Sequence, residues 1–404
     1  MPISSQLEGL LAVAVLLLAG ECIARFSGFY RRATDPHPIS RYESLDGLRG
    51  FLAIGVFLHH AVVNYYFLRT GQWSHPWSKV YNLLGQTAVV FFFLITGFLF
   101  WSKAIAGSPS VRPFQLYRGR LMRIAPMYFA SCAAVVLIIL ARTGLPPAGT
   151  RGAFFGNLSY MLPMGLTNWK PLNGVDPEQV NGFVAWTLGY EWQFYLALPL
   201  LAIFARPSRR FIVIMIGFAA FYAYRMLNRT GPIMVGGGAS FYFPFLLGAV
   251  IAQSLAAMGP IRLLEGPWGS LAFIACIVLL PVYYYNGYML GAYLLAAAAF
   301  LPAVHGNSVF GLLTFRGAKM LGAASYSIYL THVTIIRFSA SLLRPFAHTP
   351  DPGIEAWIMM TVQGLIILAI CAITYRFIEF PPIQLDKRWK RNPVSRTVAP
   401  AAVA

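Results

Sequence analysis

The sequence predicts an all-α fold, a polytopic transmembrane helix bundle with eleven spans. Two observations on the whole chain carry this prediction. The 404 residues are 58% hydrophobic and only 11% charged, whereas a soluble globular protein carries roughly 25% charged residues. Eleven apolar stretches also approach the length of about 20 residues that a membrane-spanning helix needs. This composition excludes a soluble cytosolic protein, a disulfide-rich secreted domain and a disordered chain.

The expected spans are helical, because lipid cannot satisfy free backbone groups. They are 7–24, 45–68, 80–101, 126–142, 184–204, 210–227, 239–258, 268–285, 288–304, 321–343 and 354–378. Only Tyr285-Asn286-Gly287 divides the eighth span from the ninth. The longest connection, 143–183, is expected on the outer face, and a connection of that length is typical of a functional segment.

The distribution of Lys and Arg predicts the orientation. Alternate connections, starting with 25–44, hold 20 of the 31 Lys and Arg residues, and the opposite set holds eight. Because cytoplasmic connections are enriched in these residues, we expect the N-terminus outside and the C-terminus in the cytoplasm of a bacterial inner membrane. The net charge of +18 then favours contact with anionic membrane lipids, and no nucleic-acid partner is expected.

A stripe of polar residues runs along the second span. Arg49 and His60 are eleven residues apart, about 20° from three full helical turns. Asp46 and Asn64 extend the same face at its two ends. The rise from Arg49 to His60 is about 16 Å, which places His60 near mid-membrane. A neutral imidazole there suits a general base. Alternatively, Arg49 reaches the interface and His60 hydrogen-bonds a neighbouring helix.

Two further polar sites stand out. Arg120 and Arg123 share a helix face just before Pro126, which is expected to open the next span. Paired guanidinium groups suit phosphate, although the pair could equally be a cytoplasmic anchor. Glu191 stands alone in a long apolar run, so its carboxylate must be paired or protonated. It could orient a histidine, bind a hydroxyl or pair with an arginine. No residues have the spacing of metal ligands, so no metal is expected.

Six motifs, in order, resemble those of acyltransferase family 3, which includes membrane O-acetyltransferases of bacterial O-antigens and other surface glycans. They are Leu45-Asp46-Gly47-Leu48-Arg49-Gly50 with His60, Phe91 to Leu99 (FFFLITGFL), Arg120 to Pro126 (RLMRIAP), Trp186 to Tyr195 (WTLGYEWQFY), Ser325 to His332 (SYSIYLTH) and Glu379-Phe380-Pro381. The resemblance implies a transmembrane domain of about ten helices over 45–385. Residues 1–44 would be an extra span with a cytoplasmic linker, and 386–404 a basic, disordered cytoplasmic tail.

The resemblance also implies roles for single residues. Arg49 and His60 would be the essential catalytic pair, with Glu191 on the acceptor side. Arg120 and Arg123, with Arg49, would bind the donor, acetyl-CoA or another acyl-CoA, at the cytoplasmic face. The residues expected to contact the acceptor are Asp46, Asn64, Tyr195 and His332.

The chain departs from the family pattern in several places. Thr96 and Thr187 stand where members usually carry Ser, and Trp192 stands where many carry a second Glu. Any role that needs two acids is therefore in doubt. The sequence lacks the extracytoplasmic SGNH domain that some members carry. We therefore expect the acceptor to enter the bundle directly, or a partner protein to replace that domain.

The expected function is transfer of an acyl group, most of all acetyl, from acyl-CoA on the cytoplasmic side to a carbohydrate hydroxyl. The carbohydrate would be a surface glycan, a lipid-linked sugar or a small glycoside, and His60 would be the general base. The alternative is a proton-coupled transporter of a lipid-linked sugar or small metabolite, because buried His, Glu and Arg suit that function too. A requirement for acyl-CoA distinguishes the two.

Overall fold

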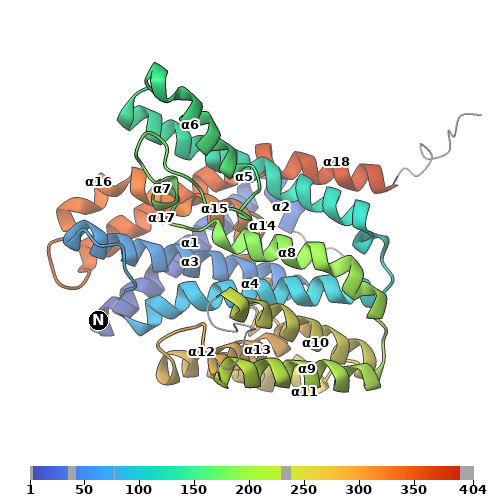
Figure 1. Ribbon diagram of the computed structural model, residues 1–404. Helices are drawn as coiled ribbons and strands as arrows, with labels where there is room; N and C mark the ends of the chain where they lie inside the picture. Colours follow the sequence, from blue (N-terminus) through green and yellow to red (C-terminus); the bar gives the residue numbers. More distant parts are fainter. Residues whose placement is uncertain (1–2, 35–41, 77, 229–237, 392–404) are drawn as a thin grey trace, which may run out of the picture.

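The computed structural model describes residues 3–34, 42–76, 78–228 and 238–391. Within these ranges the regular structure is helical, apart from one isolated bridge between Leu172 and Val175. The predicted all-α class is therefore confirmed. In Figure 1, α3 and α4 lie in the middle of the bundle, with α5 and α17 on one side and α9, α10, α12 and α13 on the other.

The helices of the first half are α1 (Ile3–Phe26), α2 (Gly28–Thr34), α3 (Glu43–Thr70), α4 (Lys79–Ile105), α5 (Pro113–Thr143), α6 (Arg151–Leu158), α7 (Pro177–Asn181) and α8 (Trp186–Leu201). Those of the second half are α9 (Arg209–Asn228), α10 (Phe243–Met258), α11 (Arg262–Glu265), α12 (Pro267–Tyr283), α13 (Leu290–Val304), α14 (Arg316–Ala323), α15 (Ser325–Phe338), α16 (Ala340–Leu343), α17 (Ile354–Thr374) and α18 (Phe380–Arg391). A π-helical turn, Tyr375–Glu379, joins α17 to α18.

Seven helical segments among the described residues are long and apolar enough to cross a membrane. They include α1, α3, α4, α5 and α9, together with 240–258 and 354–390. Each remaining expected span also coincides with one or more helices, but these are shorter. The polytopic bundle is thus confirmed, and the number of eleven spans stays a prediction.

Two expected spans differ from the helices observed. α5 begins at Pro113, so Pro126 lies inside the helix instead of opening it. Neighbouring helices and local adjustments make an internal proline tolerable in such a bundle. The expected span 321–343 is interrupted at Ala324, between α14 and α15. The division between the eighth and ninth spans is where the sequence placed it, because α12 ends at Tyr283 and α13 begins at Leu290.

Close packing explains the glycines at the start of α3. A β-carbon on Gly47 would collide with the backbone of Leu313, and one on Gly50 would collide with the Ala318 carbonyl of α14. Glycine lets two backbones approach where a side chain would hold them apart. Arg49 lies between these two glycines, so the contact with α14 fixes its position in the bundle.

The N-terminal helix is an integral part of the bundle. α1 packs on α14 and α17. On α1, the Glu21 carboxylate accepts a hydrogen bond from the Gly317 backbone N–H at 3.0 Å and pairs with Arg25 at 2.7 Å. On α2, the Tyr30 hydroxyl donates to the Ala372 carbonyl at 2.6 Å. The first 34 residues are therefore tied to the last third of the chain.

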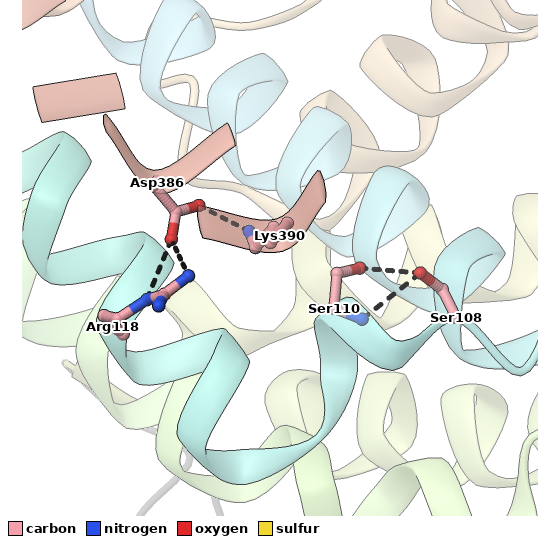
Figure 2. A network of polar contacts seen from close by, with 5 residues as sticks. All are labelled: Ser108, Ser110, Arg118, Asp386 and Lys390. Atoms are coloured by element: carbon pink, nitrogen blue, oxygen red, sulfur yellow. Dashed lines mark hydrogen bonds and ion pairs between the residues drawn. The ribbon is translucent and has the colours of Figure 1, made fainter. Parts of the chain in front are cut away.

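The C-terminal helix lies along the start of α5, as Figure 2 shows. Arg118 donates two hydrogen bonds to Asp386 Oδ1, at 3.0 and 2.6 Å, and Lys390 pairs with the other carboxylate oxygen. The Trp389 ring centre lies 3.5 Å from the Arg118 guanidinium carbon. Residues 386–391, which were expected to begin a disordered tail, are therefore helical, and 392–404 lie outside the described residues.

Candidate active site

A pocket of about 100 Å³ lies between α3, α4, α5, α8 and α15. It is lined by Arg49 of α3 and by Arg120 and Arg123 of α5. The structure thus brings together the three arginines to which the sequence assigned donor binding. The rest of the wall is mostly apolar and aromatic. It includes Val89, Phe92, Phe93, Thr96, Leu99, Phe100, Thr187, Leu188, Tyr326 and Tyr329. We call this space the arginine pocket.

Glu191 and Tyr195 of α8 line the arginine pocket too. The Tyr195 hydroxyl donates to the Glu191 carboxylate at 2.8 Å, and the Arg120 guanidinium lies 5.5 Å from the Tyr195 ring centre. Glu191 was expected on the acceptor side and Tyr195 in contact with the acceptor. The structure places both side chains beside the arginines, and their roles stay predictions. They are one helical turn apart, so one face of α8 carries both toward α5. Three guanidinium groups against one carboxylate leave the pocket cationic, which suits a phosphate-bearing ligand.

The arginines of this pocket are held in different ways. Arg49 pairs with Asp46, a half-exposed carboxylate one turn earlier, at 3.5 Å. Among the described residues, Arg120 and Arg123 form no ion pair. Glu379 is the carboxylate that attracts Arg123 most strongly. It is fully buried and accepts a hydrogen bond from Ser327 at 3.0 Å. Arg120 therefore faces the pocket without a carboxylate partner among the described residues, whereas Arg123 is attracted by the buried Glu379.

A second cavity, of about 520 Å³, contains His60. We call it the His60 cavity, and its volume is in the range of small-molecule sites, about 300–1,000 Å³. Its wall combines aromatic rings with hydrogen-bonding groups. The lining includes His59 and His60 of α3, Trp73 and His75 of the next connection, Gln86, Phe183, Trp186, Tyr288 and Tyr329. The Trp73 ring lies nearly parallel to the His60 imidazole, with 6.2 Å between their centres.

His60 is paired with His332 of α15, whose Nε2 lies 3.0 Å from His60 Nδ1. His332 Nδ1 is 3.0 Å from the Ile328 carbonyl and 2.9 Å from the Tyr329 carbonyl. Carbonyl oxygens only accept, so we assign the proton of His332 to Nδ1. His332 Nε2 must then accept. His60 Nδ1 also lies 3.0 Å from the Val56 carbonyl, so the His60 Nδ1–H is shared between these two acceptors. His60 Nε2 is left with the lone pair, as a general base requires.

Three residues expected at the acceptor site lie elsewhere. Asp46 is at the half-exposed start of α3, beside Arg49. Asn64 is fully buried, and its amide has no hydrogen-bond partner among the described residues. α3 is enclosed on every side at that depth, so the polar face predicted from helical period meets packed side chains there. His332 is fully buried behind His60. None of the three lines either cavity.

The end of the long connection 143–183 reaches the His60 cavity, which Gly182 and Phe183 line. Just before them, α7 docks on α15, because Asn181 accepts a hydrogen bond from Thr334 at 3.2 Å. The length of this connection was the one signal that pointed to it. The sequence offered no signal for Trp73, which lies in the short connection between α3 and α4.

The chain matches known proteins over most of its length. A family model described as an acyltransferase domain matches residues 42–376. The acyltransferase MdmB of Streptomyces mycarofaciens is 27% identical over 406 aligned residues, which cover 91% of this chain and 97% of that protein. Nodulation protein 10 of Rhizobium leguminosarum bv. viciae is 25% identical over 385 residues, covering 87% and 96%.

A third relative is longer than this chain. The O-acetyltransferase OatA of Staphylococcus aureus (strain NCTC 8325 / PS 47) is 24% identical over 372 residues, which cover 83% of this chain but 56% of OatA. No solved structure matches the chain.

The family match contains Arg49, Arg120, Arg123 and Glu191 of the arginine pocket, and also the pair His60 and His332. Within the described residues, no group of three His, Cys, Asp or Glu side chains is placed to hold a metal ion. The family model covers far more than half of the chain, and two of the relatives are named as an acyltransferase and an O-acetyltransferase. The chain therefore belongs to acyltransferase family 3, and it is a membrane O-acyltransferase.

Proposed function

We propose that this protein transfers an acyl group from acyl-CoA to a carbohydrate hydroxyl, with His60 as the general base. The acyl group that we propose is acetyl. The observation that carries the proposal is that His60 Nδ1 lies 3.0 Å from both the Val56 carbonyl and His332 Nε2, because two acceptors at Nδ1 leave His60 Nε2 as the proton acceptor. The name of the relative OatA, an O-acetyltransferase, supports acetyl as the group.

The donor is proposed to enter through the arginine pocket. The CoA phosphates would bind Arg120 and Arg123, with Arg49 close by. Along α3, Arg49 and His60 are separated by a rise of about 16 Å, a distance that the pantetheine arm can span. The thioester would then reach His60 while the phosphates stay with the arginines. The bias of Lys and Arg supports a cytoplasmic donor side in a bacterial inner membrane, with the N-terminus outside and the C-terminus inside.

The acceptor is proposed to enter the His60 cavity from the outer side, beside the end of the 143–183 connection. His60 Nε2 takes the hydroxyl proton as the oxygen attacks the thioester carbonyl. A C–O bond forms, the C–S bond breaks, and His60 returns the proton to the CoA sulfur. His332 Nε2 accepts the His60 Nδ1–H throughout, which stabilises the imidazolium that forms.

The test is mass spectrometry of surface glycans and glycolipids from a strain that lacks the gene. Wild-type protein should restore a base-labile acyl ester. His60→Ala should lower the transfer rate by about 10²–10⁴-fold, the contribution of a general base. His332→Ala should lower it by about ten- to a hundredfold, because it removes a hydrogen bond to a charged group. The amount of each variant in the membrane is the control.

Two other results would change the conclusion. Ester formation at the wild-type rate by His60→Ala protein would overturn the assignment of the base. If no ester depends on the gene and lipid-linked sugar accumulates on one leaflet of the deletion strain, the transporter alternative takes precedence over the acyl transfer proposed here.

A further inference from the structure

Two side chains separate the arginine pocket from the His60 cavity. Among the described residues, only Val89 of α4 and Tyr329 of α15 line both spaces. On α8, the neighbouring residues Trp186 and Thr187 face opposite sides of this boundary, because Trp186 lines the His60 cavity and Thr187 lines the arginine pocket. The boundary is therefore one side chain thick.

Tyr329 is held in place by contacts with two other helices and with His332 of its own helix. Its hydroxyl lies 2.8 Å from the Thr187 hydroxyl of α8. Its ring meets the Phe92 ring of α4 edge-on, with 6.2 Å between centres. Its backbone carbonyl accepts from His332 Nδ1 at 2.9 Å. Thr187 donates in turn to the Val184 carbonyl at 3.4 Å, so Tyr329 is the donor to Thr187.

We propose that Tyr329 and Val89 form a gate that the acyl thioester must pass to reach His60. The hydrogen bond between the Tyr329 and Thr187 hydroxyls holds this gate closed, and we call that bond the latch. This inference rests on the proposed function, since it assumes that donor and acceptor enter from opposite cavities. The gate follows from the positions of the groups, because the arginines and His60 lie in different spaces and the same two side chains stand between them.

The latch has a chemical purpose at this place. An acyl thioester can lose its acyl group to water, which gives the free acid and CoA. With the latch closed, water in the His60 cavity is kept from a donor in the arginine pocket. Opening breaks one hydroxyl–hydroxyl hydrogen bond and turns one tyrosine side chain. Once Tyr329 has turned, the Val89 side chain sets the width of the passage between the two cavities. A larger residue at this position would therefore block the acyl group.

The latch is tested with purified protein and acetyl-CoA alone, by measuring the CoA thiol released without an acceptor. Tyr329→Phe and Thr187→Val each remove one hydroxyl of the same bond. We expect each to raise acetyl-CoA hydrolysis about five- to tenfold, the effect of one hydrogen bond on a closed state. The hydrolysis rate of the double variant should be no higher than that of either single variant, because both substitutions remove the same hydrogen bond. Tyr128→Phe is the matched control, because its buried hydroxyl donates to the Met161 carbonyl away from both cavities.

The passage is tested at Val89. Val89→Phe should abolish the glycan ester while CoA still binds the purified protein with wild-type affinity. Val89→Ala should raise the ratio of butyryl to acetyl transfer, and it serves as the test if Val89→Phe does not fold.

The possible failures are distinguishable. The gate would be overturned if Tyr329→Phe and Thr187→Val both hydrolyse acetyl-CoA at the wild-type rate, or if Val89→Phe forms the glycan ester at the wild-type rate. Transfer that depends on His60 could still hold in that case. If wild-type protein neither releases CoA nor forms an ester, the proposed function itself is wrong.

Discussion

At the scale of residues, three arginines within two turns of α5 have different surroundings. Arg118 pairs with Asp386 and is covered by the Trp389 ring, so its charge is balanced by a carboxylate of the same chain. Arg120 and Arg123 line a pocket and form no ion pair among the described residues. The sequence could not separate them, because the acid that occupies Arg118 lies 268 residues away.

This difference predicts that substitution by alanine affects substrate binding at Arg120 and Arg123 but protein stability at Arg118. Arg120→Ala or Arg123→Ala should raise the KM for acetyl-CoA by about ten- to a hundredfold, because each removes a charge-assisted hydrogen bond to phosphate. Arg118→Ala should instead lower the free energy of unfolding by about 1–3 kcal/mol, because it removes two charge-assisted hydrogen bonds to Asp386 and leaves that carboxylate with Lys390 alone. The measurements are CoA release against acetyl-CoA concentration and thermal unfolding in detergent. Equal KM effects at all three positions would contradict the assignment.

Some site residues were predictable and others were not, for physical reasons. His60 stands out because an ionisable group deep in a span is costly and so marks a candidate site. The position of Glu191 beside the arginines was not predictable, since the period of a helix gives the face of a residue but not the helix that this face meets. His332 could be either an acceptor contact or a histidine satisfied between helices, and its 3.0 Å contact with His60 could not be predicted from the sequence.

At the scale of elements, the glycines of α3 set how closely it approaches its neighbours. Gly50→Ala should lower the free energy of unfolding by about 1–3 kcal/mol, because a methyl group would meet the Ala318 carbonyl and overpack the contact. Gly152→Ala on α6 is the control, since nothing lies within 4 Å of its added β-carbon. Thermal unfolding of the two variants is the measurement. A Gly50→Ala protein as stable as the control would show that α3 and α14 can shift apart without cost.

Helix boundaries were less predictable than helix positions. Apolar runs located the described helices, because burial in lipid or in the core requires them. The start of α5 at Pro113 was missed because its first turns are basic and amphipathic. The interruption at Ala324 was missed because no proline or charge marks it in the sequence.

At the scale of the molecule, the proposed direction of transfer depends on which face is cytoplasmic. In a cysteine-free background, a maleimide that cannot cross membranes should label Gly149→Cys in intact cells. It should label Ala106→Cys only after the cells are permeabilised. Both positions are exposed and lie at opposite ends of α5, so each controls for the other. The reverse pattern would place the arginine pocket outside and contradict entry of acyl-CoA from the cytoplasm.

The contact between α1 and α14 has a consequence for biosynthesis. Glu21 finds its backbone donor, Gly317, 296 residues later in the chain. At about 5–20 residues per second, a ribosome needs roughly 15 to 60 s to make that segment. During this time Glu21 has Arg25, four residues away, but not yet its backbone donor on α14. The contact between α1 and α14 can therefore form only late in synthesis.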